Sequence, residues 1–187
     1  MNFRNLEKNE LNCRVQSAGK VGVKLLLYKD ARADMEILDE TVGPENWQCE
    51  YSEQKGILFC KLGIFCRNPL KNDEGTWVWK EDAGSESNQD AEKGCASDAF
   101  KRAGFRWGIG RVLYTAPEIF IYEFDNKNEK NAAIYHSEDG KTHKCYDKFT
   151  VEKIAYSEDG KRITGLAIRN ESLGKRVYVW QDKSKQK

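Results

Sequence analysis

The chain has 187 residues, of which 39% are hydrophobic and 11% aromatic, so it can bury the core of one domain and is not a disordered polymer. Charged residues make up 33% and the formal net charge is only +1, which gives no overall preference for a polyanion. No stretch approaches the roughly 20 apolar residues of a membrane span, and the N-terminal residues lack the apolar region of a signal peptide, so we expect a cytoplasmic protein without a membrane partner.

The first half of the chain predicts a helix followed by a strand meander. Residues 25–38 fit a helical stretch, or an extended stretch that becomes helical, and residues 43–46 (GPEN) are a turn signal. Short runs rich in β-forming residues follow at 57–66, and a turn at 71–75 precedes an alternating Trp-Val-Trp sequence. Residues 47–80 therefore predict antiparallel strands joined by hairpin turns.

A central helix is predicted from about residue 88 to 107. Ser87 and Asp90 are spaced as a capping box at its start, and glycines at 108 and 110 end it. One side of this helix is expected to pack on the sheet. It is apolar because the following residues recur at spacings of three and four: Ala96, Ala99, Phe100, Ala103 and Trp107.

Strands are predicted again after Pro117. Two nearly identical turns, SEDGK at 137–141 and at 157–161, stand between β-like runs, and Asp-Gly is a common hairpin dipeptide. We interpret this repeat as convergent turn chemistry rather than as a duplicated unit. A last strand is predicted at 177–180, with a basic tail at 181–187. The predicted fold is α+β: an antiparallel β-meander packed on a central helix, with further C-terminal strands.

Positive charge is concentrated in two segments of the chain. Residues 92–114 carry five basic and two acidic side chains, and residues 161–187 carry eight and two. The rest of the chain is acidic overall. Because local fields decide contact with a polyanion, both segments are candidate contact regions, although basic tails are also common on proteins that bind no nucleic acid.

Three cations lie close together in the second half of the central helix: Lys101, Arg102 and Arg106. On a helical wheel, the two arginines form a stripe with Asp98 beside the apolar side, and Lys101 projects from the outer side. Guanidinium forks fit phosphate oxygens and lysine supplies a point charge, so this arrangement suits a nucleic-acid backbone. The alternative is a solvated surface on which Asp98 and Arg102 form an ion pair worth about 0.2–0.5 kcal/mol.

Four sequence motifs favour the nucleic-acid contact over the solvated surface. Residues 98–108 match D-x-x-K-R-A-x-x-x-(aromatic)-G, and residues 108–114 match G-x-G-R-x-L-Y. Upstream, residues 38–47 match L-x-E-x-x-G-x-x-N-W, and residues 77–82 read WVWKED. In this order and spacing, over about residues 25–115, the motifs resemble the Rad-fifty-two/DdrA/Sak family of recombination proteins, in particular its bacterial and phage branch.

The resemblance implies a protein that binds single-stranded DNA and anneals it to a complementary DNA strand in recombination and repair. No ATP is needed, because base pairing supplies the driving free energy. The resemblance also implies a homo-oligomeric ring or arc with DNA in an outer basic groove, and a single-strand-binding protein is a candidate partner. We expect one annealing domain at 1–187, with a β-β-β-α core at about 25–115 and a β-rich extension at about 116–180.

The resemblance also carries DNA-backbone contacts onto Lys101 and Arg102, and onto Arg32 upstream. Where eukaryotic members have a further basic residue, this chain has Phe105, followed by Arg106. Either Arg106 makes that contact instead, or Phe105 packs elsewhere. The predicted DNA-binding residues are Lys101, Arg102, Arg106, Arg32 and Arg111, with weaker candidates on the meander at Lys61, Arg67, Lys71 and Lys80.

A catalytic or metal site is not expected. The carboxylates of Glu36, Asp39 and Glu40 would spread around a helix, and no phosphate-binding glycine motif is complete. The remaining candidate ligands, which lack the spacing of a zinc site, are His136, His143 and Cys145. We therefore expect a non-enzymatic protein without a cofactor, and six reduced, mostly buried cysteines. The alternatives to annealing are a protein that coats DNA ends and an oligomeric scaffold.

Overall fold

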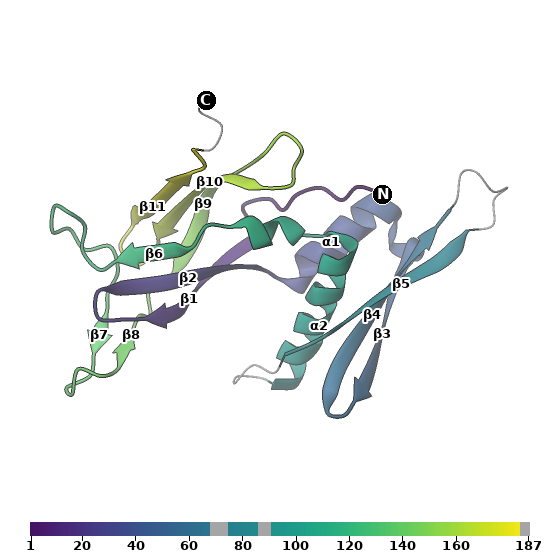
Figure 1. Ribbon diagram of the computed structural model, residues 1–187, viewed down its shortest axis with the longest axis horizontal. Coiled ribbons are helices and arrows are strands. Elements are labelled where there is room, and N and C mark those ends of the chain that lie inside the picture. Colours follow the sequence, from purple (N-terminus) through teal and green to yellow (C-terminus); the bar gives the residue numbers. More distant parts are fainter. Residues whose placement is uncertain (68–74, 86–90, 184–187) are drawn as a thin grey trace. The chain divides into compact units, whose positions relative to one another are not determined.

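The computed structural model describes residues 1–67, 75–85 and 91–183 (Figure 1). They fall into two compact units: one contains residues 1–5 and 29–111, and the other contains residues 6–28 and the chain from 112 onward. The described residues contain two α-helices and mostly antiparallel sheets, which confirms the α+β class. That the whole chain acts as one annealing domain stays a prediction.

The first unit contains the predicted meander and central helix. Its elements are α1 (Ala31–Val42), the 3-10 helix η1 (Pro44–Asn46), β3 (Trp47–Gln54), β4 (Ile57–Cys66), β5 (Thr76–Ala83) and α2 (Ala91–Trp107). The strands are antiparallel in the order β3–β4–β5, and α2 packs against β4 and β5. The two β-forming runs at 57–66 are one continuous strand. Residues 71–74 of the predicted turn, and the predicted capping box of Ser87 and Asp90, lie outside the described residues.

The core of the first unit lies between β4 and α2. Leu62 and its neighbours two positions away alternate along β4, so their side chains share one buried face. The indole Nε1 of Trp107 donates a hydrogen bond to the carbonyl of Leu62 at 3.0 Å, which ties the end of the helix to the middle strand. The predicted apolar side of the helix is confirmed. Its fully buried residues are Ala99, Phe100 and Ala103, and Ala96 and Trp107 are half-buried.

The second unit is built on a six-stranded sheet in the order β11–β10–β9–β1–β2–β6. Its elements are β1 (Leu11–Ala18), β2 (Gly22–Lys29), η2 (Arg111–Thr115), β6 (Ile119–Tyr122), β7 (Tyr135–His136), β8 (His143–Lys144), β9 (Phe149–Tyr156), β10 (Ile163–Asn170) and β11 (Lys175–Gln181). The C-terminal strands were predicted, whereas β1 was not. Its pairing with β9 joins residues about 140 positions apart, as in Asn12 opposite Thr150, and no local pattern predicts such a pairing.

The two SEDGK turns have the same hydrogen bonds. The N–H of Gly140 donates to the carbonyl of Ser137 at 2.9 Å, and the N–H of Gly160 donates to that of Ser157 at 2.8 Å. Both glycines have positive φ, 65° and 67°, where a side chain would be strained. One turn joins β7 to β8 and the other joins β9 to β10, in two different sheets. This placement favours convergent turn chemistry.

All six cysteines are free thiols, and only Cys60 is fully buried. The expectation that most would be buried is wrong, because Cys49 lies on the edge strand β3 and Cys66 ends β4, where solvent reaches part of each residue. Within the described ranges, no helix has the length and apolar character needed to cross a membrane.

Candidate nucleic-acid interface

Arg102 and Arg106 of α2 converge on the carboxylate of Asp82, near the end of β5. The Nε of Arg106 lies 2.9 Å from Oδ2, and the Nε of Arg102 lies 3.4 Å from Oδ1. The side chains of Arg102 and Arg106 are 45% and 58% exposed, whereas that of Asp82 is only 15% exposed. The two guanidinium groups are therefore held side by side at an open surface by one partly buried carboxylate.

The overall charge of this group is positive. Burial by itself would raise the pKa of Asp82, but hydrogen bonds from Arg106 and the Ala83 N–H, together with the charge of Arg102, outweigh it and lower the pKa below its ordinary value. Asp82 is therefore ionised at neutral pH and offsets one of the two arginines. An arginine has five N–H donors, so a bond from Nε to a carboxylate leaves donors for a phosphate.

Lys80 and Arg111 lie at the C-terminal end of α2. The Nζ of Lys80 donates to the carbonyl of Arg106 at 3.0 Å and lies 4.4 Å from the centre of the Trp107 ring. Arg111 donates to the carbonyls of Phe105 and Arg106, at 2.9 and 2.8 Å. The last carbonyls of a helix lack partners within the helix and carry partial negative charge, so both cations stabilise this end. They are structural residues as well as candidate phosphate contacts.

Lys101 is half-buried on α2, on the side that faces α1. Its carbonyl lies 3.5 Å from the Nζ of Lys29, and its own charge acts on both Lys29 and Asp34. The outward position expected from the helical wheel is therefore wrong. The wheel takes account of packing on the sheet alone, whereas α1 also packs against α2.

Lys29 and Asp34 form a buried ion pair at this junction of α1 and α2. Their side chains are 1% and 0% exposed, and the Lys29 ammonium donates to both carboxylate oxygens. The ring of Phe105 lies 4.2 Å from the ammonium. A Cβ added at Gly104 would lie 2.7 Å from Oδ2 of Asp34, so the helix approaches the pair closely. This pair was not predicted from the sequence, because two charges five positions apart ordinarily indicate a surface.

The position of Phe105 decides one question that the sequence left open. Its ring packs over the buried Lys29, while the neighbouring Arg106 contacts Asp82. Phe105 therefore packs against the buried pair of Lys29 and Asp34 and contributes to the fold. That Arg106 contacts DNA stays a prediction.

The other predicted cations whose placement is described lie on different elements from the cations of α2. Arg32 is exposed in the first turn of α1. Lys61 lies on the sheet face opposite α2, because it alternates with the buried residues of β4. Arg67 is exposed just after β4, and Lys71 lies outside the described residues. The cations that meet at one place, which we call the α2 cation cluster, are Lys80, Arg102, Arg106 and Arg111.

Asp98 has a different partner from the one expected. It accepts hydrogen bonds from the backbone N–H and the hydroxyl of Ser85, at 3.0 and 2.9 Å. Arg102 lies beside Asp82 instead. The predicted surface ion pair between Asp98 and Arg102 is therefore wrong, because Asp82 near the end of β5 and Ser85 just after it supply a partner for each of them.

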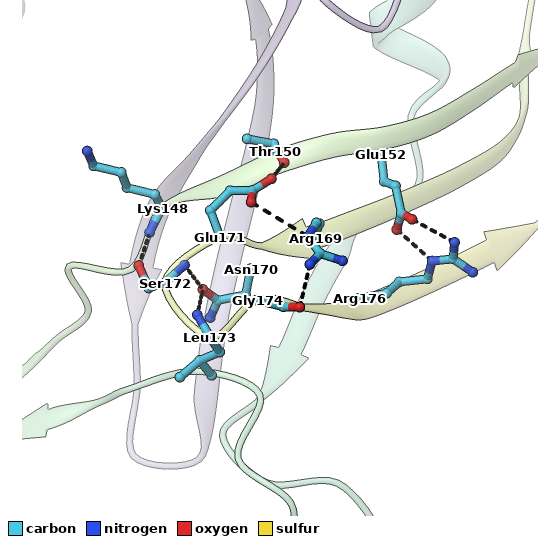
Figure 2. Close-up of polar contacts among 10 residues, drawn as sticks. All are labelled: Lys148, Thr150, Glu152, Arg169, Asn170, Glu171, Ser172, Leu173, Gly174 and Arg176. Atoms are coloured by element: carbon cyan, nitrogen blue, oxygen red, sulfur yellow. Dashed lines mark hydrogen bonds and ion pairs between the residues drawn. The ribbon is translucent and has the colours of Figure 1, made fainter.

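The second basic segment, residues 161–187, is partly neutralised where the structure describes it. Figure 2 shows Arg176 facing Glu152 on the next strand but one, with contacts of 2.6 and 2.7 Å between the guanidinium and the carboxylate. Arg169 lies 3.6 Å from Glu171 and also donates to a backbone carbonyl (Figure 2). Each of these arginines has its own acid, unlike the two that share Asp82.

The candidate catalytic and metal residues make local contacts. Asp39 accepts a hydrogen bond from the indole of Trp47 at 2.6 Å, which links α1 to β3. His136 and His143 face each other across the β7–β8 hairpin, with their Nδ1 atoms 2.8 Å apart. Among the residues that the structure describes, no group of three or more His, Cys, Asp or Glu is placed to hold a metal ion.

Comparisons with known proteins agree with the resemblance that the motifs indicate. The family model described as the Rad52/22 family double-strand break repair protein matches residues 3–132. The single-stranded DNA-binding protein DdrA of Deinococcus radiodurans is 34% identical over 106 residues, which are 54% of this chain and 46% of that protein. The match thus spans about half the length of this curated relative. No solved structure is significantly similar to the chain.

Proposed function

This chain belongs to the Rad52/22 family of double-strand break repair proteins, and from this premise we propose that it binds single-stranded DNA and promotes annealing of complementary strands. The proposed phosphate contacts are the α2 cation cluster together with Lys101 and Arg32. The observation that carries the proposal is the shared carboxylate of Asp82. It holds Arg102 and Arg106 side by side while offsetting only one of their two charges.

The proposed mechanism separates the backbone of the DNA from its bases. Phosphate oxygens bind the guanidinium N–H groups that Asp82 does not engage, and such contacts carry no sequence information. The bases of the bound strand then stay available to a complementary strand. Pairing supplies the free energy of annealing, so the proposed activity is non-enzymatic and independent of ATP.

The cation cluster is tested with a charge-matched pair of double variants. Arg102→Gln with Arg106→Gln removes two cations from the cluster, and Arg169→Gln with Arg176→Gln removes two from the second unit. We expect only the first variant to lower the salt dependence of single-strand binding, by about 0.7 in the logarithmic slope for each phosphate that is no longer neutralised. Lys101 is left unchanged in this test, because its half-buried position makes its replacement a change in stability as well. Equal slopes for the two variants would remove the cluster from the interface.

Annealing is tested with two complementary labelled oligonucleotides, without nucleotide or metal. We expect the wild type and the Arg169/Arg176 control to accelerate duplex formation, and the Arg102/Arg106 variant to accelerate it less. Binding without acceleration would favour a protein that coats and protects DNA ends. Absence of binding in the wild type would favour a scaffold.

The proposal includes assembly of several copies into a ring or arc. The edge strands β3 and β6 support it, because the outer backbone groups of an edge strand can pair with another chain. Light scattering over a range of protein concentrations measures the mass of the assembly. A monomer at every concentration would contradict this part of the proposal and leave the DNA-binding part standing.

A further inference from the structure

The face of the β3–β5 sheet opposite α2 carries a row of aromatic side chains. Side chains alternate between the two faces along a strand, and the buried Leu62 faces α2, so Gly63 and Phe65 lie on the opposite face. Trp79 and Trp77 stand directly opposite them on β5. We call this group of Phe65, Trp77 and Trp79 the aromatic face.

The three rings of the aromatic face are in contact and half-buried, so solvent reaches part of each residue. The centres of Phe65 and Trp77 are 5.6 Å apart with an edge-on arrangement, and those of Trp77 and Trp79 are 5.9 Å apart with planes inclined by 31°. Contiguous apolar side chains that solvent reaches often mark a surface that binds a ligand or a partner.

Gly63, which stands opposite Trp79 on the neighbouring strand, lets the Trp79 indole lie close to the backbone of the sheet. A Cβ at Gly63 would lie 2.7 Å from Cε3 and Cζ3 of Trp79, so any other residue there would push the indole away. At the other end, a Cβ at Gly75 would lie 2.3 Å from Cζ of Phe65. Gly63 and Gly75 therefore leave room for the rings of Trp79 and Phe65 to pack against the strands.

Charge around the aromatic face is nearly balanced. The Nζ of Lys61 lies 4.7 Å from the centre of the Trp79 ring, and Arg67 follows β4 at the other end of the row. Glu50 and Glu81 stand in register on both sides of Lys61. The exposed Gln48, opposite Gly63, adds an amide that can both donate and accept hydrogen bonds. Phosphate attraction is therefore weak here, and a ligand would be held mainly by the rings.

We propose that the aromatic face of Phe65, Trp77 and Trp79 is a stacking site for the unpaired bases of single-stranded DNA. This inference rests on the proposed function. Every base has a flat π-face, so stacking on aromatic side chains tolerates any sequence, as an annealing protein requires. A base takes the place of the Lys61 ammonium over Trp79, and the flexible lysine side chain moves aside.

The proposed stacking site is a separate contact from the α2 cation cluster. The two lie on opposite faces of the same sheet, so they hold different stretches of strand. They also differ in chemistry: the cluster binds phosphates and depends on salt, whereas the aromatic face binds bases and depends little on salt. This difference makes the two sites separable by experiment.

The test compares an oligomer of thymidine with an abasic strand of the same length, which keeps the phosphates and lacks the bases. The test variant is Trp77→Leu with Trp79→Leu, and Trp77→Phe with Trp79→Phe restores the rings. Tyr51→Leu is the matched control, because this side chain is 46% exposed but alternates onto the α2 face. Circular dichroism and light scattering check that each variant keeps its fold and assembly.

We expect the leucine variant to lose about tenfold in affinity for the thymidine strand, with an unchanged salt slope and no loss for the abasic strand. The phenylalanine variant and Tyr51→Leu should bind the thymidine strand within about twofold of the wild type. A leucine variant that binds like the wild type would overturn the proposal. Dissociation of the assembly without loss of monomer binding would overturn it as well, and would assign the face to a second copy of this chain. If the wild type binds neither strand, the proposed function itself fails.

Discussion

The buried pair of Lys29 and Asp34 offers the sharpest test of the first unit. Replacing Asp34 by Asn keeps the shape of the side chain but leaves the Lys29 ammonium buried with a neutral partner. Removing one member of a buried ion pair typically costs about 3–5 kcal/mol, which is a large part of the stability of a domain. We therefore expect Asp34→Asn to unfold at a much lower urea concentration than the wild type.

The free energy of unfolding that Asp34→Asn loses has an upper bound, and this bound depends on pH. Burial lowers the pKa of Lys29 from its ordinary value of 10.5, and the charge of Asp34 opposes this shift. Without that charge, the ammonium can lose its proton on folding. At pH 7 this costs about 5 kcal/mol, at about 1.4 kcal/mol for each pH unit below the ordinary pKa. Near pH 9 the bound falls to about 2 kcal/mol, because the folded variant binds fewer protons than the unfolded chain and gains stability as pH rises.

Tryptophan fluorescence during urea unfolding is the appropriate assay, because four of the five tryptophans lie in the first unit. The double variant Lys29→Met with Asp34→Leu removes both charges and should lose far less stability than Asp34→Asn, as apolar replacement of buried ion pairs often does. The competing effect is burial of the Asp34 carboxylate, which raises its pKa to about 6 against the opposing charge of Lys29. If the cost of burying the Asp34 carboxylate outweighs its attraction to Lys29, Asp34→Asn will be as stable as the wild type or more stable, and the reasoning is refuted.

Three further changes test the packing of each unit by urea unfolding. Gly104→Ala should cost about 1–3 kcal/mol, because its Cβ would lie 2.7 Å from Asp34, and a variant with unchanged stability would mean that the pair can shift. Trp107→Ala should cost about 3–5 kcal/mol, because it removes the packing of the indole and its hydrogen bond to Leu62, and a fully stable variant would contradict the helix face. Asn170→Leu should cost about 1–3 kcal/mol, because the buried amide donates at 2.8 Å to the carboxylate of Asp147 and its oxygen accepts two backbone N–H groups. Figure 2 shows the two accepted bonds, from Ser172 and Leu173. Near-wild-type unfolding of this variant would show that water replaces these bonds.

Local pattern was enough to predict the meander and the central helix of the first unit and several strands of the second. The stretch predicted at 25–38 left two alternatives open, and the structure divides it between β2 and α1. A period of three to four identified the buried side of α2, and β-forming runs identified β4 and the strands after Pro117. The two SEDGK turns were also predictable, because their hydrogen bonds join residues at most five positions apart. The four motifs between about residues 25 and 115 together predicted the family, because their order and spacing can be read along one chain.

Only the tertiary structure decided what each cation contacts and where β1 belongs. Arg106 meets Asp82 from 24 positions away, and β1 pairs with β9 across most of the chain. Sequence periodicity reports which side of an element is apolar, and it carries no information on which distant charge lies opposite. For this reason Lys101 and Phe105, neighbours on a helix whose face was predicted correctly, could be assigned to the Lys29–Asp34 junction only when α1 was seen to pack against α2.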